Sequence, residues 1–395
     1  MTAYDSRKVC FLINNLDTGG AQTLLRNIIE LDDRSTVDYT VCYAGGANEF
    51  GGQFEALDVE VVDLGARTEQ PQFDPRPVVR TVQYFGRHEF DVIHGHLPYG
   101  SVLARLAGQR ANAAVVTTHH SVRRNYHPIE RSLEGSTRRY DDATVFVSEA
   151  VAASFDDRGS VDTPALTIYN GIDAAAFRER VEAADGDGLR GELGATGKRL
   201  VVTVGRCIEA KRQVDLVRAV DHLTDRVAAP ELHVAIVGDG PQRSALEAAV
   251  RERELGDYVS VVGRVPNAEI HRYYAAADLY AQVSLFEGMP MTLLEAMAAG
   301  VPIIGTDVPG IEEFVDDEVG QLVPPESPRA LADAMSTLSE DDCRRLGDAC
   351  RRRVSEQYEI DRTVAAYHDL YEQVTNESPS TSRPPASQPE PTSSR

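Results

Sequence analysis

Residues 286–295 read F-E-G-M-P-M-T-L-L-E and are followed by A-M-A-A-G-V-P-I-I. The stretch joins an apolar strand pattern to a helical pattern through a glycine turn. Gly288 permits a close approach of the backbone, and Pro290 is tolerated because it stands near the first turn of the helix. The free amides of Met291 and Thr292 can then point at a phosphate, aided by the helix dipole. We therefore predict a strand-turn-helix unit that binds an anion.

The same order of strand and helix extends along the chain in both directions. The predicted strands are Val9–Asn14, Tyr39–Tyr43, Val59–Leu64, Val92–His94, Ala114–Thr118, Thr144–Val147, Leu200–Val204, His233–Val237, Val259–Val262, Leu279–Gln282, Pro302–Gly305 and Gly320–Val323. Their alternation with helices predicts parallel sheets covered on both faces. Two such series indicate two Rossmann-like, doubly wound α/β domains that face a central cleft. Ligands bind such sheets beyond the carboxyl ends of the strands.

Length and composition agree with two domains. The chain has 395 residues, too many for one ordinary core, and 42% of them are hydrophobic. We place an N-terminal domain at residues 1–180 and a C-terminal domain at residues 190–355. The glycine-rich segment Asp185–Gly197 marks the boundary, and its start, Asp185–Asp187, is predicted to be a flexible turn. Residues 376–395, rich in Ser, Pro and Thr, are predicted to be disordered.

The charge balance restricts the partners. A formal net charge of −22 creates a field that repels nucleic acid. Of the 40 basic residues, only Lys8, Lys198 and Lys211 are lysines. An excess of carboxylates with so few lysines is typical of a halophilic protein from a high-salt cytoplasm. An ordinary acidic protein from a GC-rich genome is the alternative.

Cysteine usage and hydropathy indicate a cytoplasmic protein. The five cysteines are scattered and show no C-x-x-C spacing, which argues against a disulfide framework and a zinc site. The polar start of the chain predicts no signal peptide, and no apolar run reaches the roughly 20 residues that span a bilayer. We expect any contact with the cell membrane to be peripheral, at its inner face.

Two cations follow the first strand of the second series. Arg206 stands after Gly205 at the strand's end, and Lys211 lies five residues further on, before the next helix. An arginine offers a planar fork of donors and a lysine a point charge, and both can converge on a diphosphate. They would stabilise the charge that grows on a leaving diphosphate, as a metal does in other enzymes. We therefore predict a metal-independent site without a cofactor.

Two acids flank the turn at residues 288–292. Glu287 stands before it, and Glu295 lies about one helical turn beyond it, where it could accept hydrogen bonds from ribose hydroxyls. This Glu-x7-Glu pattern, together with Gly205-Arg206 and Lys211, resembles family 4 glycosyltransferases (glycosyl transferases group 1), which are retaining enzymes with the GT-B fold. The resemblance implies that Glu287 contacts the donor sugar and Glu295 the ribose. It also implies a C-terminal helix near residues 360–375 that packs back on the first domain.

The resemblance extends to further loops. Gly19-Gly20 matches a glycine element that brings amides near the donor phosphates, and Gly238 matches a wall of the donor site. Arg264-Val265 matches a loop that flanks the nucleobase. The implied donor-binding residues are Gly19, Gly20, Arg206, Lys211, Gly238, Arg264, Val265, Glu287, Gly288, Met289, Pro290, Met291, Thr292 and Glu295.

Histidines and arginines gather at the strand ends of the first domain. His120 resembles the family histidine that lines the reaction centre, although the sequence T-T-H-H also permits His119. His96 resembles a second histidine on the acceptor side. The implied catalytic residues are His120, Glu287, Arg206 and Lys211, and the implied acceptor-side residues are His96, His119, Arg123 and Arg124. Metal binding by the histidines is a rival, but no carboxylate or cysteine completes a ligand set.

The segment from His119 to Tyr140 is basic in an otherwise acidic chain. It holds Arg123, Arg124, Arg131, Arg138 and Arg139 against two acids. Such a segment could hold a phosphorylated lipid acceptor or anionic headgroups at a membrane surface. A charge-balanced surface helix is the alternative.

Together, the residues and the resemblance predict a retaining hexosyltransferase. It would move a hexose-type sugar from a UDP- or GDP-sugar to a lipid-linked acceptor or a surface glycan. Two other functions stay open at this point. One is a nucleotide-sugar epimerase on the same scaffold, and the other is a non-catalytic subunit that binds a nucleotide-sugar.

Overall fold

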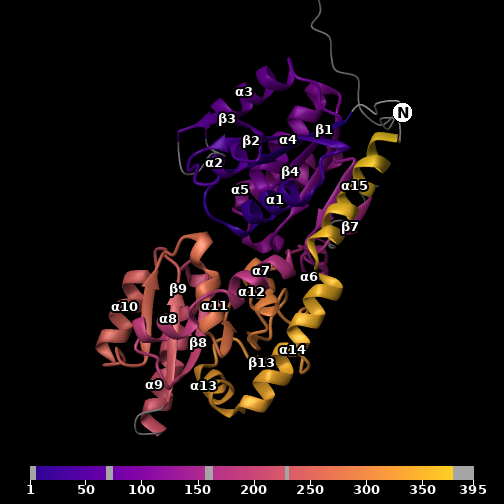
Figure 1. Cartoon of the computed structure of the whole chain (residues 1–395). Helices are drawn as coiled ribbons and strands as arrows, with labels where there is room; N and C mark the ends of the chain where they lie inside the picture. The colour runs from indigo at the N-terminus through magenta and orange to yellow at the C-terminus, as the bar shows by residue number, and fades with distance from the viewer. Residues whose placement is uncertain (1–5, 68–73, 156–162, 227–230, 377–395) are drawn as a thin grey trace, which may run out of the picture.

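The computed structural model describes residues 6–67, 74–155, 163–226 and 231–376. Figure 1 shows two lobes, each built around one sheet with helices on its faces. All strand pairs in both sheets are parallel. The predicted fold class, two Rossmann-like α/β domains of the GT-B type, is confirmed.

The first lobe contains a seven-stranded sheet in the order β3-β2-β1-β4-β5-β6-β7. Its strands are β1 Arg7–Ile13, β2 Val37–Gly45, β3 Glu60–Ala66, β4 Val92–His96, β5 Ala114–His119, β6 Ala143–Phe146 and β7 Ala165–Thr167. Its helices are α1 Gly20–Leu31, α2 Gly51–Glu55, α3 Arg76–Phe85, α4 Pro98–Ala111, α5 Pro128–Thr137 and α6 Glu149–Ala153. The central strand β1 is buried from Val9 onward, as its continuous apolar run predicts for a strand covered on both faces.

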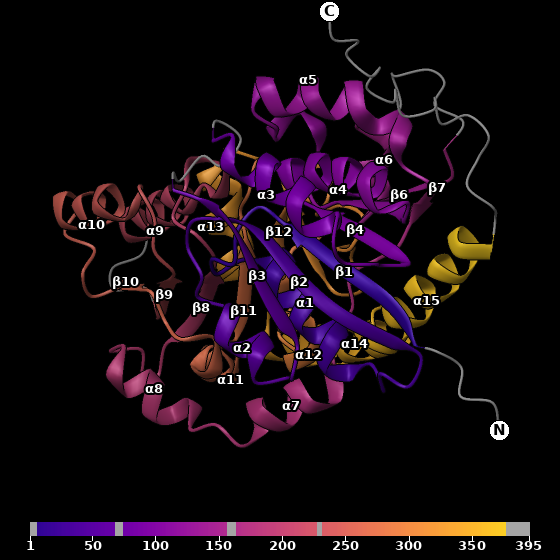
Figure 2. The ribbon, with the colours of Figure 1, turned by 90° about the horizontal axis from the view of Figure 1, so that it is seen from above.

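The second lobe contains a six-stranded sheet in the order β10-β9-β8-β11-β12-β13. Its strands are β8 Arg199–Val204, β9 Leu232–Val237, β10 Val259–Gly263, β11 Leu279–Gln282, β12 Ile303–Thr306 and β13 Gly320–Val323. Its helices are α7 Ala174–Glu182, α8 Gly186–Glu192, α9 Gln213–Arg226, α10 Arg243–Glu252, α11 His271–Ala276, α12 Met291–Ala299, α13 Pro328–Thr337 and α14 Glu340–Gln357. Viewed from above, the two lobes overlap, with α7 and α8 along one side (Figure 2).

Each predicted strand has a counterpart in the structure, but two local predictions differ from it. The short strand β7 has no predicted counterpart. The flexible turn predicted at Asp185–Asp187 is wrong, because Asp185 caps helix α8 by accepting a hydrogen bond from the amide of Gly188 at 2.8 Å. Of the tail predicted to be disordered, only Asn376 lies within the described residues, where it ends the last helix.

The last helix, α15 (Ile360–Asn376), leaves the second lobe and runs back along the first (Figure 1). Tyr367 and Tyr371 are fully buried in the core of the first lobe. His368 lies 2.9 Å from the carboxylate of Asp32, which follows α1. Helix α15 is therefore part of the first lobe's core.

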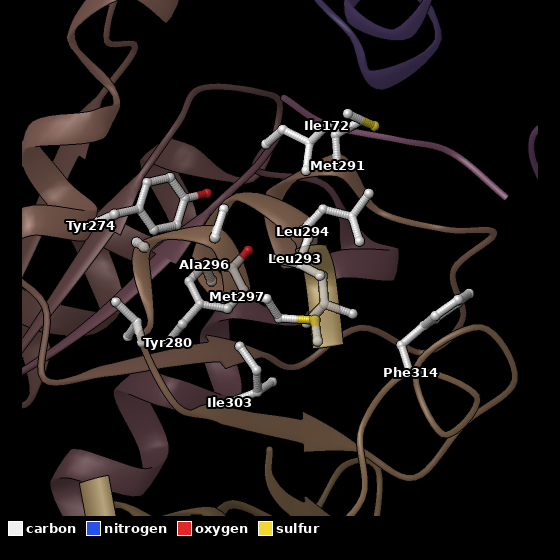
Figure 3. Close-up of a cluster of buried hydrophobic side chains, with 14 of the residues drawn as sticks. Ile172, Tyr274, Tyr280, Met291, Leu293, Leu294, Ala296, Met297, Ile303 and Phe314 are labelled. Carbon is white, nitrogen blue, oxygen red and sulfur yellow. The ribbon is translucent and has the colours of Figure 1, made fainter. Parts of the chain in front are cut away.

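Every residue of helix α12 except Thr292 is buried, and the helix lies in the core of the second lobe (Figure 3). Leu293, Leu294 and Met297 are fully buried. Burial of each such side chain contributes about 1.5–3 kcal/mol. Gly300, at φ 76°, ends the helix in the left-handed conformation that glycine favours. This packing fixes the position of the turn that precedes α12.

Candidate active site

Glu287 is the centre of a hydrogen-bond network between β11 and α12. Its Oε1 accepts hydrogen bonds from Lys211 Nζ at 2.5 Å, Gln282 Nε2 at 2.7 Å and Ser284 Oγ at 2.5 Å. Its Oε2 makes no hydrogen bond with any residue that the structure describes. The carboxylate is therefore held through one oxygen, while the other is available to a ligand hydroxyl.

Two cations follow the end of β8, and one of them, Lys211, contacts this carboxylate. Lys211 ends a short 3-10 turn. Its ammonium group has three N–H donors, and only one of them is used by the hydrogen bond to Glu287. Arg206 is exposed, and its guanidinium makes no hydrogen bond or ion pair within the described part of the chain. Both cations keep donors available for an anion.

The start of α12 faces the first lobe. No side chain caps this helix, so the amides of Met291 and Thr292 keep free N–H groups. Gly20, the first residue of α1, lies opposite, because a Cβ placed there would be 3.6 Å from Met291 Cγ. A Cβ on Gly288 would stand 2.1 Å from the carbonyl oxygen of His120. Residues from both lobes thus meet at the turn.

Close backbone contacts hold the loops around the turn. Gly310, at φ +82°, packs so closely that a Cβ would lie 2.2 Å from the carbonyl oxygen of Glu287. Gly238, at φ +136°, packs against Gly205 in the same way, because a Cβ on Gly238 would lie 2.0 Å from the carbonyl oxygen of Gly205. On the facing lobe, Gly19 precedes α1 and offers no side-chain cap. Gly238 and Gly310 favour glycine because of their positive φ and the backbone atoms beside them.

Asn170 ties the connection between the lobes to the same turn. Its side-chain Nδ2 donates to the carbonyl oxygen of Met289 at 3.0 Å, and its amide lies 3.0 Å from Met289 Sδ. Pro290 follows with extended backbone as the N-cap of α12. The connection is therefore bound directly to the turn.

Glu295 lies on the buried side of α12 and is 8% exposed. Its Oε2 accepts a hydrogen bond from Tyr274 Oη at 2.8 Å. Burial raises the pKa of Glu295 to about 7, and the hydrogen bond from Tyr274 opposes this shift. A carboxyl with this pKa changes its charge near neutral pH, so its affinity for a hydroxyl donor depends on pH.

Two of the strand-end histidines form a pair. His96 Nδ1 lies 3.0 Å from His120 Nε2. His96 is fully buried, whereas His120 is half-buried beside the turn at Gly288. The third, His94, lies behind them, with Nδ1 2.7 Å from Tyr371 Oη and Nε2 2.7 Å from Thr118 Oγ1.

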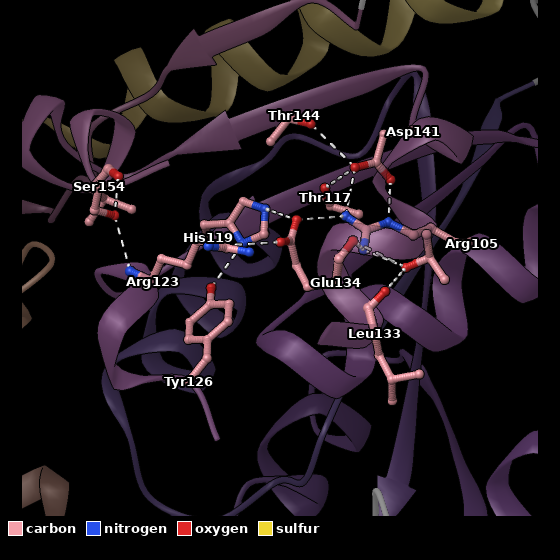
Figure 4. Close-up of polar contacts among 12 residues, drawn as sticks. Arg105, Thr117, His119, Arg123, Tyr126, Leu133, Glu134, Asp141, Thr144 and Ser154 are labelled. Atoms are coloured by element: carbon pink, nitrogen blue, oxygen red, sulfur yellow. Dashed lines mark hydrogen bonds and ion pairs between the residues drawn. The ribbon is translucent and has the colours of Figure 1, made fainter. Parts of the chain in front are cut away.

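His119 does not lie on the acceptor side. Its ring is fully buried, with Nδ1 2.8 Å from Tyr126 Oη and Nε2 3.8 Å from Glu134 Oε1 (Figure 4). The aromatic rings of Phe146 and Phe155 pack against it. The acceptor-side prediction for His119 is therefore wrong, because this side chain points into the core of the first lobe.

The basic segment lies beside a buried ion-pair cluster of the first lobe. Arg105 of α4, outside the segment, forms a buried double hydrogen bond with Asp141, at 2.7 Å for each contact (Figure 4). Arg123 Nε lies 3.8 Å from buried Glu134, and its side chain is partly exposed, so its place on the acceptor side stays a prediction. Arg124 instead stays exposed and stacks over Phe286 of the second lobe at 5.0 Å.

Arg264 reaches across to the first lobe. Its guanidinium pairs with Glu49 and lies 3.0 Å from Thr18 Oγ1 and 3.6 Å from Asp17 Oδ1. Such exposed pairs contribute only about 0–1 kcal/mol. A nucleotide could therefore displace the contact. The neighbouring Val265 packs against the core of the second lobe.

Other residues of the site had no counterpart in the sequence prediction. Gln282, Ser284 and Tyr274 all supply hydrogen bonds to the two acids. Gln282 ends a predicted strand, which is the signal that could have found it. In the described ranges, no group of three or more His, Cys, Asp or Glu side chains is arranged to hold a metal ion, and no helix is long and apolar enough to cross a membrane.

Comparison with known proteins gives matches along most of the chain. Residues 189–357 match the family model of glycosyl transferases group 1, and residues 18–176 match that of glycosyltransferase family 4. The GDP-mannose-dependent alpha-(1-6)-phosphatidylinositol monomannoside mannosyltransferase of Mycobacterium tuberculosis (strain CDC 1551 / Oshkosh) is 31% identical over 373 residues. The match covers 89% of this chain and 94% of the relative.

Two further similarities agree. The N-acetyl-alpha-D-glucosaminyl L-malate synthase of Bacillus anthracis is 27% identical, with 76% of this chain and 79% of the relative covered. The crystal structure of Anabaena Alr3699/HepE in complex with UDP-glucose superposes with a TM-score of 0.80 at 21% identity. It covers 93% of this chain and 99% of that one. The chain is therefore a glycosyltransferase with the GT-B fold and belongs to family 4, the glycosyl transferases of group 1.

Proposed function

We propose that this glycosyltransferase transfers a hexose-type sugar from a UDP- or GDP-sugar with retention of configuration and without a metal ion. The observation that carries the proposal is the meeting of Lys211, Glu287 and the uncapped start of α12 at one point opposite Gly20. Cations and free amides together form a site for a diphosphate.

In this proposal the chain contributes position and charge. Lys211, Arg206 and the amides at the turn bind the diphosphate and stabilise the charge that develops as it leaves. Glu287 Oε2 accepts a hydrogen bond from a sugar hydroxyl, because Oε1 is already occupied. Oxygens of the leaving diphosphate assist removal of the acceptor's proton, and the two lobes hold both substrates in place.

The relatives suggest which substrates to test first. One is named for GDP-mannose and phosphatidylinositol monomannoside, and the structural neighbour was solved with UDP-glucose. We propose a lipid-linked or surface-glycan acceptor and a cytoplasmic protein that meets the membrane only at its inner face.

The test begins with thermal stabilisation by UDP- and GDP-sugars, with and without EDTA. Transfer is then assayed for Glu287→Ala, Arg206→Ala and Lys211→Ala, each expected to lose about 10²–10³-fold in kcat. Lys198→Ala and Arg226→Ala are matched controls, because these cations contact the carbonyl of Asp257 and the carboxylate of Asp333, away from the turn. Full activity in all three site variants would refute the mechanism. An isomerised donor in the absence of acceptor would indicate an epimerase instead.

A further inference from the structure

His96 and His120 share a hydrogen bond whose direction decides what His120 offers to a ligand. The two nitrogens are 3.0 Å apart, so one ring donates and the other accepts. His96 Nε2 is buried and has no hydrogen-bond partner among the described residues. His120 Nδ1 also makes no hydrogen bond within that part of the chain, but His120 is only half-buried.

Burial favours the neutral form of both rings. Burial lowers the pKa of His96 well below its usual value, and His94 and His120 lower it further. Burial also lowers the pKa of His120 to about 4. His94 packs 4.1 Å from the His96 ring, and Phe11 packs 5.3 Å from it. Neither neighbour is a carboxylate that could stabilise an imidazolium.

Two arrangements of the shared proton are conceivable, and they differ in what they bury. If His120 donates, His96 carries an N–H at Nε2 that is buried without an acceptor. If His96 donates, Nε2 of His96 is a bare lone pair, and His120 carries its own proton at the accessible Nδ1. Among backbone groups, orphaned buried N–H groups are rarer than under-satisfied carbonyl oxygens, and the same preference applied to the ring nitrogens favours the second arrangement.

We propose that His96 is a positioning residue that donates its Nδ1 proton to His120 Nε2. It thereby fixes His120 as the tautomer that donates from Nδ1 to a hydroxyl oxygen of the donor sugar. This rests on the proposed function, since it requires a nucleotide-sugar at the turn. His120 is then a hydrogen-bond donor rather than a general base.

The direct test is ¹⁵N NMR of the full chain labelled at histidine, recorded without substrate from pH 6 to 8. His96→Asn and His120→Asn identify the two resonance pairs. The expected result is a His120 ring protonated at Nδ1 and bare at Nε2, with no change over this pH range. Protonation at Nε2, or titration of either ring between pH 6 and 8, would overturn the proposal.

Kinetics test the consequence for transfer. His96→Leu removes the donor, whereas His96→Asn keeps an amide N–H near the position of Nδ1. We expect kcat/KM to fall about tenfold in His96→Leu, the value of one neutral hydrogen bond, and to recover substantially in His96→Asn. Equal activity of the two variants would contradict the assignment.

The two readouts separate this inference from the proposed function. If His96→Leu does not fold, the tautomer of the unaltered protein still decides the inference. If the NMR spectra show the predicted tautomer but the protein binds no nucleotide-sugar, the proposed function is refuted and the inferred position of the proton is still supported.

Discussion

Gly288→Ala should separate the two lobes at the point where they meet. The added Cβ would lie 2.1 Å from the carbonyl oxygen of His120 and 2.9 Å from its carbonyl carbon. Both are backbone atoms and cannot rotate away. Because real Cβ contacts essentially never fall below 3.0 Å, the turn or the first lobe must move by about 0.9 Å.

A displacement of this size is enough to disturb transfer. A misplacement of about 1 Å can cost roughly 10²-fold in rate, which corresponds to about 2.7 kcal/mol of transition-state stabilisation. The assay is kcat/KM for sugar transfer, with the melting temperature measured alongside. Gly191→Ala is the control, because no atom lies within 4 Å of a Cβ built there. A folded Gly288→Ala protein with unchanged kcat/KM would refute the placement of the turn against His120.

Three further outcomes are expected. In the unaltered protein, nucleoside diphosphate binding should tighten as pH rises through about 7, the pKa of Glu295. Tyr274→Phe removes the hydrogen bond that opposes the raised pKa of Glu295, so binding to this variant should tighten only at higher pH. Calorimetry that shows the same pH profile for both proteins would contradict this prediction. Arg105→Ala leaves Asp141 and Glu134 buried without their cation, so the free energy of unfolding measured in urea should fall by about 3–5 kcal/mol. Arg139 is exposed, so Arg139→Ala should change the free energy of unfolding by no more than about 0.5 kcal/mol. The pKa of His368 is raised and the pKa of Asp32 is lowered, so their pair stabilises the fold between the unfolded pKa values of 3.8 and 6.5. This stabilisation is lost as pH rises through the folded pKa of His368, so the melting temperature of His368→Asn should fall below that of the unaltered protein most at about pH 5–6. An equal difference in melting temperature at pH 8 would count against this prediction.

The strands and the turn at Gly288 could be predicted from the sequence, because both have strong local patterns. Continuous apolar runs mark buried parallel strands, and glycine and proline mark the turn that starts α12. The short strand β7 escaped prediction because three residues carry too little pattern. Helix α8 escaped because its glycines suggested a loop, whereas Asp185 supplies a cap.

The orientation of side chains within the site could not be predicted in the same way. T-T-H-H fits two registers, and a shift of one residue sends a side chain to the opposite face of a sheet. The buried cluster of Glu134, Tyr126 and Phe155 places His119 in the core of the first lobe, and this cluster forms only in the folded lobe. The contact of Arg264 with Glu49 likewise joins residues 215 positions apart.

The central claim is that the diphosphate of the donor binds where Lys211 and the start of α12 meet. The most direct measurement is a crystal structure of the protein with bound UDP or GDP. We predict phosphate oxygens within about 3.2 Å of Lys211 Nζ and of the amide nitrogen of Thr292, with the guanidinium of Arg206 turned toward them. A diphosphate bound elsewhere, with Arg206 still exposed to solvent and Lys211 contacting only Glu287, would contradict the account.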